Sequence, residues 1–134
     1  MVPVNIGLAA KRSGLSAKMI RHYEQIGLLP TAVRSDSGYR LYGPDALETL
    51  AFIKRARDLW FSLESVGALL ALKRDPARAS ADVQTVAQRH IAELNERIEA
   101  LIALRNSLQG MADQCQGNAS SECAILDQLT APAR

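Results

Sequence analysis

The sequence predicts a mainly α-helical protein made of a small front domain, one long helix and a short tail. Three observations support this fold class. Short amphipathic segments separated by Gly, Ser and Pro fill residues 1–75, and a helical pattern without Gly or Pro runs up to Gly110. The chain's two cysteines follow that pattern. We therefore expect three domains, at residues 1–75, 76–112 and 113–134.

Length and charge limit the function classes. By length alone, a chain of 134 residues is one domain, or one small domain with an appendage. Residues 1–75 hold 11 Lys and Arg against 7 Asp and Glu, whereas residues 76–134 hold 5 against 7, so the basic excess lies at the front. No apolar run reaches the roughly 18 residues of a membrane span, and the N-terminus lacks a signal-peptide pattern. We expect a cytoplasmic protein without membrane contact.

The first 30 residues have the pattern of a helix-turn-helix motif. Asn5 can cap a helix over 6–12, and Ser16 can cap a second helix that ends before Gly27. Two short helices joined by a tight turn that contains Gly are typical of this motif. Lys18 and Arg21 are three residues apart on one face of the second helix, so they can enter a major groove together. The alternative is a small helical hairpin with a solvated basic face.

A hairpin with alternating basic and aromatic residues follows over 34–42. Asp36-Ser37-Gly38 suits its turn, and Arg34, Tyr39 and Arg40 would form a wing that binds phosphates. Two more helices are predicted, one from Pro44 to about residue 59 and one capped by Ser62, over about 63–72.

The long helix is expected from about residue 81 to 111, with Ser80 as its N-cap and Gly110 as its stop signal. Its apolar residues recur at alternating spacings of four and three, as in a coiled coil. A single apolar seam of this length cannot bury itself, so we interpret it as a dimerisation helix. The alternative is a helix that lies over the protein's own core. The seam consists of Ala87, Ile91, Leu94, Ile98, Leu101 and Leu108.

Cys115 and Cys123 flank a flexible loop that contains Gly117. The seven residues between them are too many for a zinc knuckle, and two ligands are too few for zinc. Two thiolates alone favour a soft monovalent d¹⁰ ion. From the spacing, a metal site, a redox pair and two unused thiols all remain open.

At this point the residues resemble a family. The strings Ile20-Arg21-His22-Tyr23-Glu24, Gly27-Leu28-Leu29-Pro30 and the 34–42 segment are similar to the winged helix-turn-helix of MerR-family regulators. The resemblance implies a homodimer through antiparallel long helices, bound to double-stranded promoter DNA and acting on RNA polymerase. It also implies these DNA contacts: Lys18, Arg21, Tyr23, Arg34, Tyr39, Arg40 and Arg57.

The tail resembles the copper-efflux (CueR) branch of that family. This resemblance implies that Cys115 and Cys123 bind one Cu(I), Ag(I) or Au(I) ion per protomer, and that Ser80 belongs to the surroundings of the metal. A Ser at that position accompanies monovalent sensing, and a Cys accompanies divalent sensing. Gln116 and Ala124 stand where the branch usually has Pro. The implied mechanism is activation of resistance genes by distortion of an overlong promoter spacer when the ion binds.

Other function classes fit the sequence less well. An enzyme would need a convergent set of polar groups, and the sequence offers no such set. An iron–sulfur sensor would need four cysteines, and the chain has 2. A drug sensor would have a larger ligand-binding domain. A MerR-type sensor of a Zn- or Hg-type ion, or of thiol redox state, remains the alternative.

Overall fold

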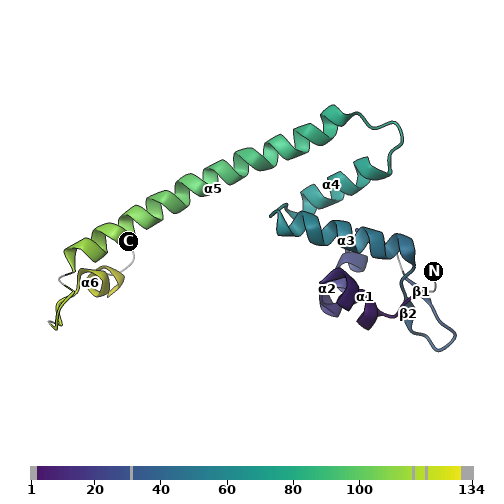
Figure 1. Cartoon of the computed structure of the whole chain (residues 1–134), viewed down its shortest axis with the longest axis horizontal. Coiled ribbons are helices and arrows are strands. Elements are labelled where there is room, and N and C mark those ends of the chain that lie inside the picture. Colours follow the sequence, from purple (N-terminus) through teal and green to yellow (C-terminus); the bar gives the residue numbers. More distant parts are fainter. Residues whose placement is uncertain (1–2, 31, 116, 120, 131–134) are drawn as a thin grey trace. The chain divides into compact units, whose positions relative to one another are not determined.

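The computed structural model describes residues 3–30, 32–115, 117–119 and 121–130. It forms two compact units, Met1–Val86 and Ala87–Arg134. The mainly α-helical fold predicted from the sequence is confirmed (Figure 1). The elements are α1 (Ile6–Ser13), α2 (Ala17–Gln25), β1 (Val33–Arg34), β2 (Arg40–Leu41), α3 (Pro44–Asp58), α4 (Leu63–Arg74), α5 (Ser80–Gln114) and α6 (Ala124–Thr130).

The caps predicted for the helix-turn-helix motif are present. The Asn5 side chain accepts a hydrogen bond from the Leu8 backbone N–H at 2.9 Å, and Ser16 Oγ accepts one from Met19 at 3.1 Å. Each cap satisfies a backbone donor that a helix N-terminus would otherwise leave unpaired. Gly14 ends α1 with φ 77°, in the left-handed region that favours glycine. The turn between α1 and α2 therefore has the short, fixed geometry that the motif requires.

The core of the first unit joins the two helices of the motif to those that follow. α1 packs on α2 and α3, and α3 packs on α4 (Figure 1). Burial of apolar surface holds this arrangement together, at about 25 cal/mol per Å². Because the core lies on the inner side of α2, the opposite side of that helix is left for a ligand. The largest fully buried side chains are Tyr23, Tyr42, Ile20, Leu29, Leu50, Ile53 and Val66.

The predicted hairpin is present as a two-stranded antiparallel sheet. Its register pairs Val33 with Leu41 and Arg34 with Arg40. Gly38 closes the turn with φ 85°, and its N–H donates to the Ser35 carbonyl at 2.9 Å. Beyond β2, two backbone hydrogen bonds of 2.9 and 2.7 Å tie Tyr42 to Val4. The base of the hairpin is thus anchored to the start of the chain.

The long helix α5 spans 35 residues, and both ends differ from the expectation. Ser80 is its first helical residue rather than its cap, and the helix continues through Gly110 to Gln114. A glycine within a helix costs only about 0.5–1 kcal/mol, which the surrounding Leu, Met, Ala and Gln residues offset. The predicted stop at Gly110 is therefore wrong. None of the described helices combines the length and apolar composition that crossing a lipid bilayer requires.

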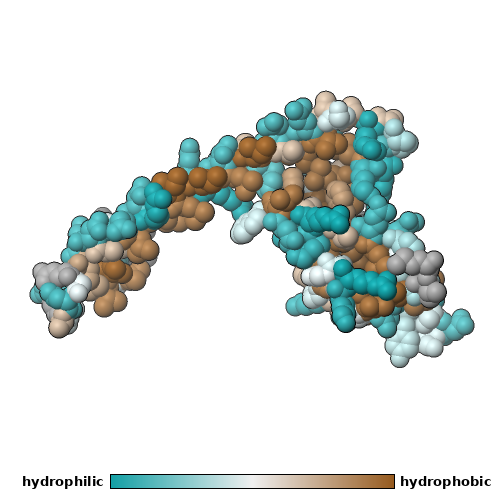
Figure 2. Space-filling view, viewed as in Figure 1, coloured by the Kyte–Doolittle hydropathy of each residue, from teal (hydrophilic) through white to brown (hydrophobic). Residues whose placement is uncertain are grey.

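Much of the apolar seam of α5 is exposed in the single chain. Apolar side chains gather on the surface along α5 and around α6 in Figure 2. Exposed leucines and isoleucines at this spacing are what a partner helix would bury. The exposed seam residues are Ile91, Ile98, Leu101 and Leu108.

Replacement of Gly14 by alanine should destabilise the protein. An alanine at this position would have to keep φ 77°, which residues with a side chain rarely adopt, and its Cβ would lie 3.1 Å from Lys54 Cε. We expect Gly14→Ala to lower the free energy of unfolding by about 1–2 kcal/mol, measured by urea denaturation. Gly110→Ala is the control, because nothing lies within 4 Å of its added Cβ. It should leave stability unchanged or raise it by up to about 1 kcal/mol. Equal losses of stability in the two variants would contradict a special requirement for glycine at position 14.

Candidate nucleic-acid interface and metal centre

The outer face of α2 carries the basic residues predicted to contact DNA. Lys18 and Arg21 are both exposed and, with His22 and Gln25, line a shallow hollow of about 320 Å³. These residues recur at helical spacing, so they share one face. The opposite side of the helix is buried in the core. α2 therefore presents cations and amide groups outward on a rigid support, as insertion into a DNA groove requires.

Tyr23 does not share this outer face. Its side chain is 1% exposed and belongs to the core. In the free protein this side chain packs in the core, and the predicted DNA contact of Tyr23 stays a prediction. The helical spacing indicates this burial, because Tyr23 lies three residues after the buried Ile20 and so shares its face of α2.

The hairpin brings two predicted residues together. Arg34 and Arg40 are direct cross-strand partners, so both side chains leave the same face of the sheet. Like charges in this position are destabilising. The Arg34 Nη1 donates to the Gly38 carbonyl at 2.8 Å, and Tyr39 is exposed at the tip. Two adjacent guanidinium groups on an exposed hairpin form a site suited to an anion such as phosphate.

Glu24 is a residue near the predicted DNA contacts that the sequence analysis did not single out. Its side chain is 9% exposed, and its Oε2 lies 3.5 Å from Arg40 Nε. Tyr42 donates its hydroxyl hydrogen to Oε1 of the same carboxylate. Burial, followed by this hydrogen bond, raises the pKa of Tyr42. A signal was available, since Glu24 is the one acidic residue of α2.

Arg57 lies near the end of α3, as expected for a residue beside the DNA backbone. Its Nη1 donates to the Phe61 carbonyl at 2.6 Å, across the turn into α4. The neighbouring Lys54 pairs with Asp58 at 2.6 Å. Arg57 is exposed, so its charge can still act on a phosphate while one of its N–H groups holds the turn.

The two cysteines lie at helix ends. Cys115 directly follows α5, and its N–H bonds the carbonyls of Met111 and Ala112 at 3.1 and 3.2 Å. Cys123 directly precedes α6, and its carbonyl accepts the first helical hydrogen bond, from Asp127, at 3.1 Å. Both side chains are half-buried, and neither is in a disulfide. Two regular elements thus fix the backbone on each side of the loop.

The side chain of Cys115 lies close enough to Cys123 to influence its pKa. The pKa of Cys123 is lowered, first by the backbone N–H of Leu126 and then by the Cys115 side chain. Both interactions favour the thiolate, which is the form that binds metals. The two soft donors therefore lie near each other, and their role as metal ligands stays a prediction.

No third ligand joins the two sulfurs among the residues that the structure describes. No group of three or more His, Cys, Asp or Glu side chains suits a metal ion in those residues. Two thiolates alone fit a soft monovalent ion better than zinc, which takes four ligands.

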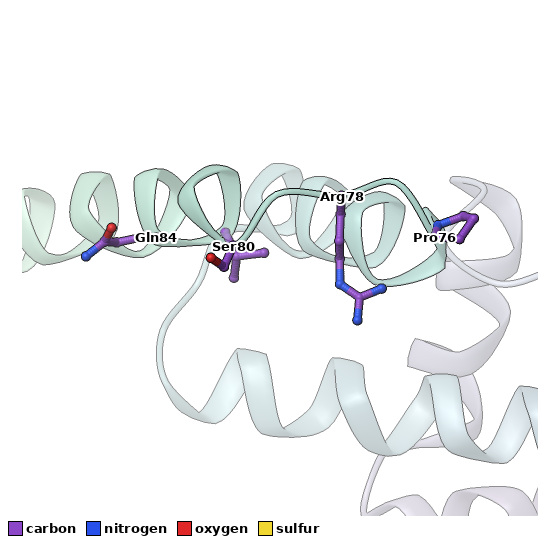
Figure 3. Close-up of a pocket in the computed structure, with 5 residues that line it drawn as sticks. Pro76, Arg78, Ser80 and Gln84 are labelled. Carbon is purple, nitrogen blue, oxygen red and sulfur yellow. The ribbon is translucent and has the colours of Figure 1, made fainter.

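Ser80 begins α5 and Cys115 follows its other end. Ser80 lines an open cavity of about 730 Å³ with Pro76, Arg78 and Gln84 (Figure 3). Arg78 Nη1 donates to the carbonyls of Lys73 and Asp75 at 3.2 and 3.3 Å, which fixes the connection that leads into α5.

Two family models together match most of the chain. Residues 5–42 match "MerR family regulatory protein", and residues 47–111 match "MerR, DNA binding". Together they include α1–α4, the hairpin and most of α5.

The relatives are regulators of similar length. Heavy metal-dependent transcription regulator 2 of Rhizobium meliloti is 49% identical over 126 residues, which is 94% of this chain and 86% of the relative. The transcriptional regulator CueR of Salmonella typhi is 40% identical over 127 residues, or 95% and 92%. Among solved structures, PbrR691 from Ralstonia metallidurans in complex with lead(II) is 32% identical, with a TM-score of 0.77 over 94% and 98% of the two chains.

The lowered pKa of Cys123 predicts enhanced thiol reactivity. In Cys115→Ser protein, where Cys123 is the one remaining thiol, alkylation by iodoacetamide should reach half its maximal rate at a lower pH than in the same protein unfolded by guanidinium. The reason is that unfolding removes the Leu126 N–H from the thiolate. Identical midpoints in folded and unfolded protein would contradict this prediction.

Proposed function

Because this chain belongs to the MerR family of transcriptional regulators, we propose that it activates transcription when a monovalent coinage-metal ion binds Cys115 and Cys123. Regulators of this family bind promoter DNA as dimers and work with RNA polymerase. The observation that supports the proposal is the pair of free thiols at the ends of α5 and α6, close enough for Cys115 to lower the pKa of Cys123, without a third ligand among the described residues. The ion, Cu(I), Ag(I) or Au(I), would bind once per protomer.

The donor set supports a monovalent ion. Two thiolates and one monovalent ion leave a net charge of −1, whereas a third thiolate would make the same site −2. The smaller charge costs less to remove from water in a closed pocket. A divalent ion would tolerate a third thiolate, and PbrR691 is a relative solved with lead(II). Ser80 supplies no thiolate, which favours Cu(I), Ag(I) or Au(I) over a Zn- or Hg-type ion.

The dimer supports a role for Ser80. In an antiparallel pair of α5 helices, the start of one helix would lie beside the end of the other. Ser80 of one protomer would then close the pocket over the cysteines of its partner. The exposed apolar seam of α5 supports this pairing, since it needs a covering helix. Metal binding and dimerisation would thereby share one interface.

The mechanism follows from what the loop and α6 can do. Cys115 and Cys123 would hold the ion between the end of α5 and the start of α6. Ile125, Leu126 and Leu129 on α6 would then dock against the dimer interface, because Leu126 and Leu129 are otherwise exposed. Docking would bias the two DNA-binding units, which bend and untwist an overlong promoter spacer. Bends of this kind cost about 1–6 kcal/mol.

The nearness of the two thiols also favours a second candidate, a sensor of thiol redox state. An oxidant would join Cys115 and Cys123 in a disulfide and order the same loop without a metal. The two candidates predict different inducers, so transcription in vitro under anaerobic conditions with Ag(I) separates them. Activation without oxygen supports the metal sensor.

Removal of one thiol should uncouple metal from transcription. We expect Cys115→Ser protein to bind promoter DNA with unchanged affinity and to lose at least tenfold of its response to Cu(I) or Ag(I) in run-off transcription. Ser121→Ala is the matched control, because it alters the same loop without changing a thiol. An undiminished metal response in Cys115→Ser would remove Cys115 from the site.

Addition of a third thiolate should change the choice of metal. Ser80→Cys should raise affinity for Zn(II) or Hg(II) relative to Ag(I) by about tenfold or more, because a divalent ion gains both a ligand and charge compensation. Competition titrations followed by ultraviolet thiolate absorbance measure this ratio. If the ratio in Ser80→Cys equals that of the unsubstituted dimer, Ser80 does not lie at the metal pocket.

A further inference from the structure

The carboxylate of Glu24 joins the DNA-reading helix to the wing. Its two oxygens have different partners, Arg40 Nε at 3.5 Å and the Tyr42 hydroxyl. Tyr42 is itself 1% exposed and is tied to Val4 by two backbone hydrogen bonds. The Glu24 carboxylate therefore has a rigid donor, Tyr42, at one oxygen. Its other oxygen faces Arg40, whose side chain is 35% exposed.

Arg40 has few other restraints. Among the described residues, its side chain makes no other ion pair or hydrogen bond. Its cross-strand partner is Arg34, a like charge that pushes it away. A guanidinium has five N–H donors, so a contact through Nε leaves the four donors on the Nη atoms for a ligand. Glu24 is thus the group that sets where those four donors lie.

We propose that Glu24 is a positioning residue for DNA binding, whose carboxylate holds the Arg40 guanidinium so that its Nη donors meet a DNA phosphate. The proposal rests on the proposed DNA contact of Arg40. Tyr42 completes the arrangement, since it fixes the second oxygen of Glu24 and thereby the direction of the first. α2 and the wing are then presented to DNA as one surface.

Two effects of the carboxylate oppose each other. Its negative charge repels phosphates, which weakens DNA binding. It also orders Arg40 in advance, which removes the entropy cost of fixing a flexible side chain on binding. Arg40 already offsets the charge of Glu24 in the free protein, and salt screens the remainder beyond about 8 Å. The gain from ordering Arg40 therefore exceeds the repulsion between Glu24 and phosphates. Loss of that ordering should weaken DNA affinity about three- to tenfold.

The test measures DNA affinity by fluorescence anisotropy, with full-length protein and a labelled duplex selected from a random-sequence pool by the unsubstituted protein. Glu24→Gln should weaken binding about three- to tenfold. The slope of log K against log salt should not change, because the phosphate contact is still made. In an Arg40→Met background, Glu24→Gln should have no further effect. Asp58→Asn is the matched control, because it breaks the Lys54–Asp58 pair, which lies outside the wing.

Three outcomes overturn the proposal. These are tighter binding by Glu24→Gln, an equal loss from Glu24→Gln with and without Arg40, or an equal loss in Asp58→Asn. Failure of the proposed function looks different, because then the unsubstituted protein selects no duplex or Arg40→Met binds as well as the unsubstituted protein.

A second measurement needs no variant and therefore does not depend on how the variants fold. ¹⁵N relaxation of arginine side chains in the unsubstituted, DNA-free protein reports how rigid each Nε–H group is. Arg40 should approach the order parameter of rigid backbone, about 0.85, whereas Arg21, which has no ion pair among the described residues, should fall below about 0.6. An Arg40 as mobile as Arg21 would show that Glu24 does not hold it.

Discussion

The long helix imposes the main constraint on this protein, because a single chain cannot bury its apolar seam. A 35-residue helix has room for one apolar stripe and a polar remainder, and much of that stripe is exposed here. Burial of a leucine contributes about 1.5–3 kcal/mol, so the exposed seam represents a large driving force for pairing. The other proposed features depend on this pairing. A two-fold dimer presents two DNA-binding units at a fixed spacing, and an antiparallel one would bring Ser80 to the thiols of the partner.

Charge organises the DNA-binding unit in the way that apolar burial organises the long helix. Lys18 and Arg21 lie on α2, and Arg34 and Arg40 are like-charged cross-strand partners on the wing. Glu24 is the buried counter-charge that connects the two elements. Such an arrangement is favourable in the free protein because one carboxylate oxygen accepts the Tyr42 hydroxyl hydrogen and the other lies 3.5 Å from the Arg40 cation. It is also ready for an anion, since a phosphate relieves the remaining repulsion.

Sequence reasoning succeeded where the determining residues are near neighbours. The caps at Asn5 and Ser16 and the turn at Gly38 depend on residues within four positions, and the structure confirms them. It failed where the outcome depends on distant residues or on competing costs. Glu24 meets Tyr42 only after the chain has folded the wing back onto α2, and no spacing rule encodes that contact. The helix-forming residues around Gly110 offset the cost of a glycine, so α5 continues past it to Gln114. The metal ligands and DNA contacts stay predictions, because they concern a partner chain, an ion and DNA.

Metal binding can control a promoter only as far as it favours one state of the dimer over another. A shift from 1% to 99% of the active state requires about a 10⁴-fold preference, or about 5.5 kcal/mol. Burial of exposed leucines on α6 would supply a free energy of this size. Leu126 is 62% exposed and Leu129 is 75% exposed, so docking both would contribute about 2–4 kcal/mol per protomer and about 4–8 kcal/mol per dimer. In this proposal the ion bound by the two thiols would position α6, and the burial of the apolar side chains of α6 would supply the free energy that bends DNA. A regulator built in this way needs no ion contact with the DNA-binding unit, because each α6 acts at the interface that both protomers share.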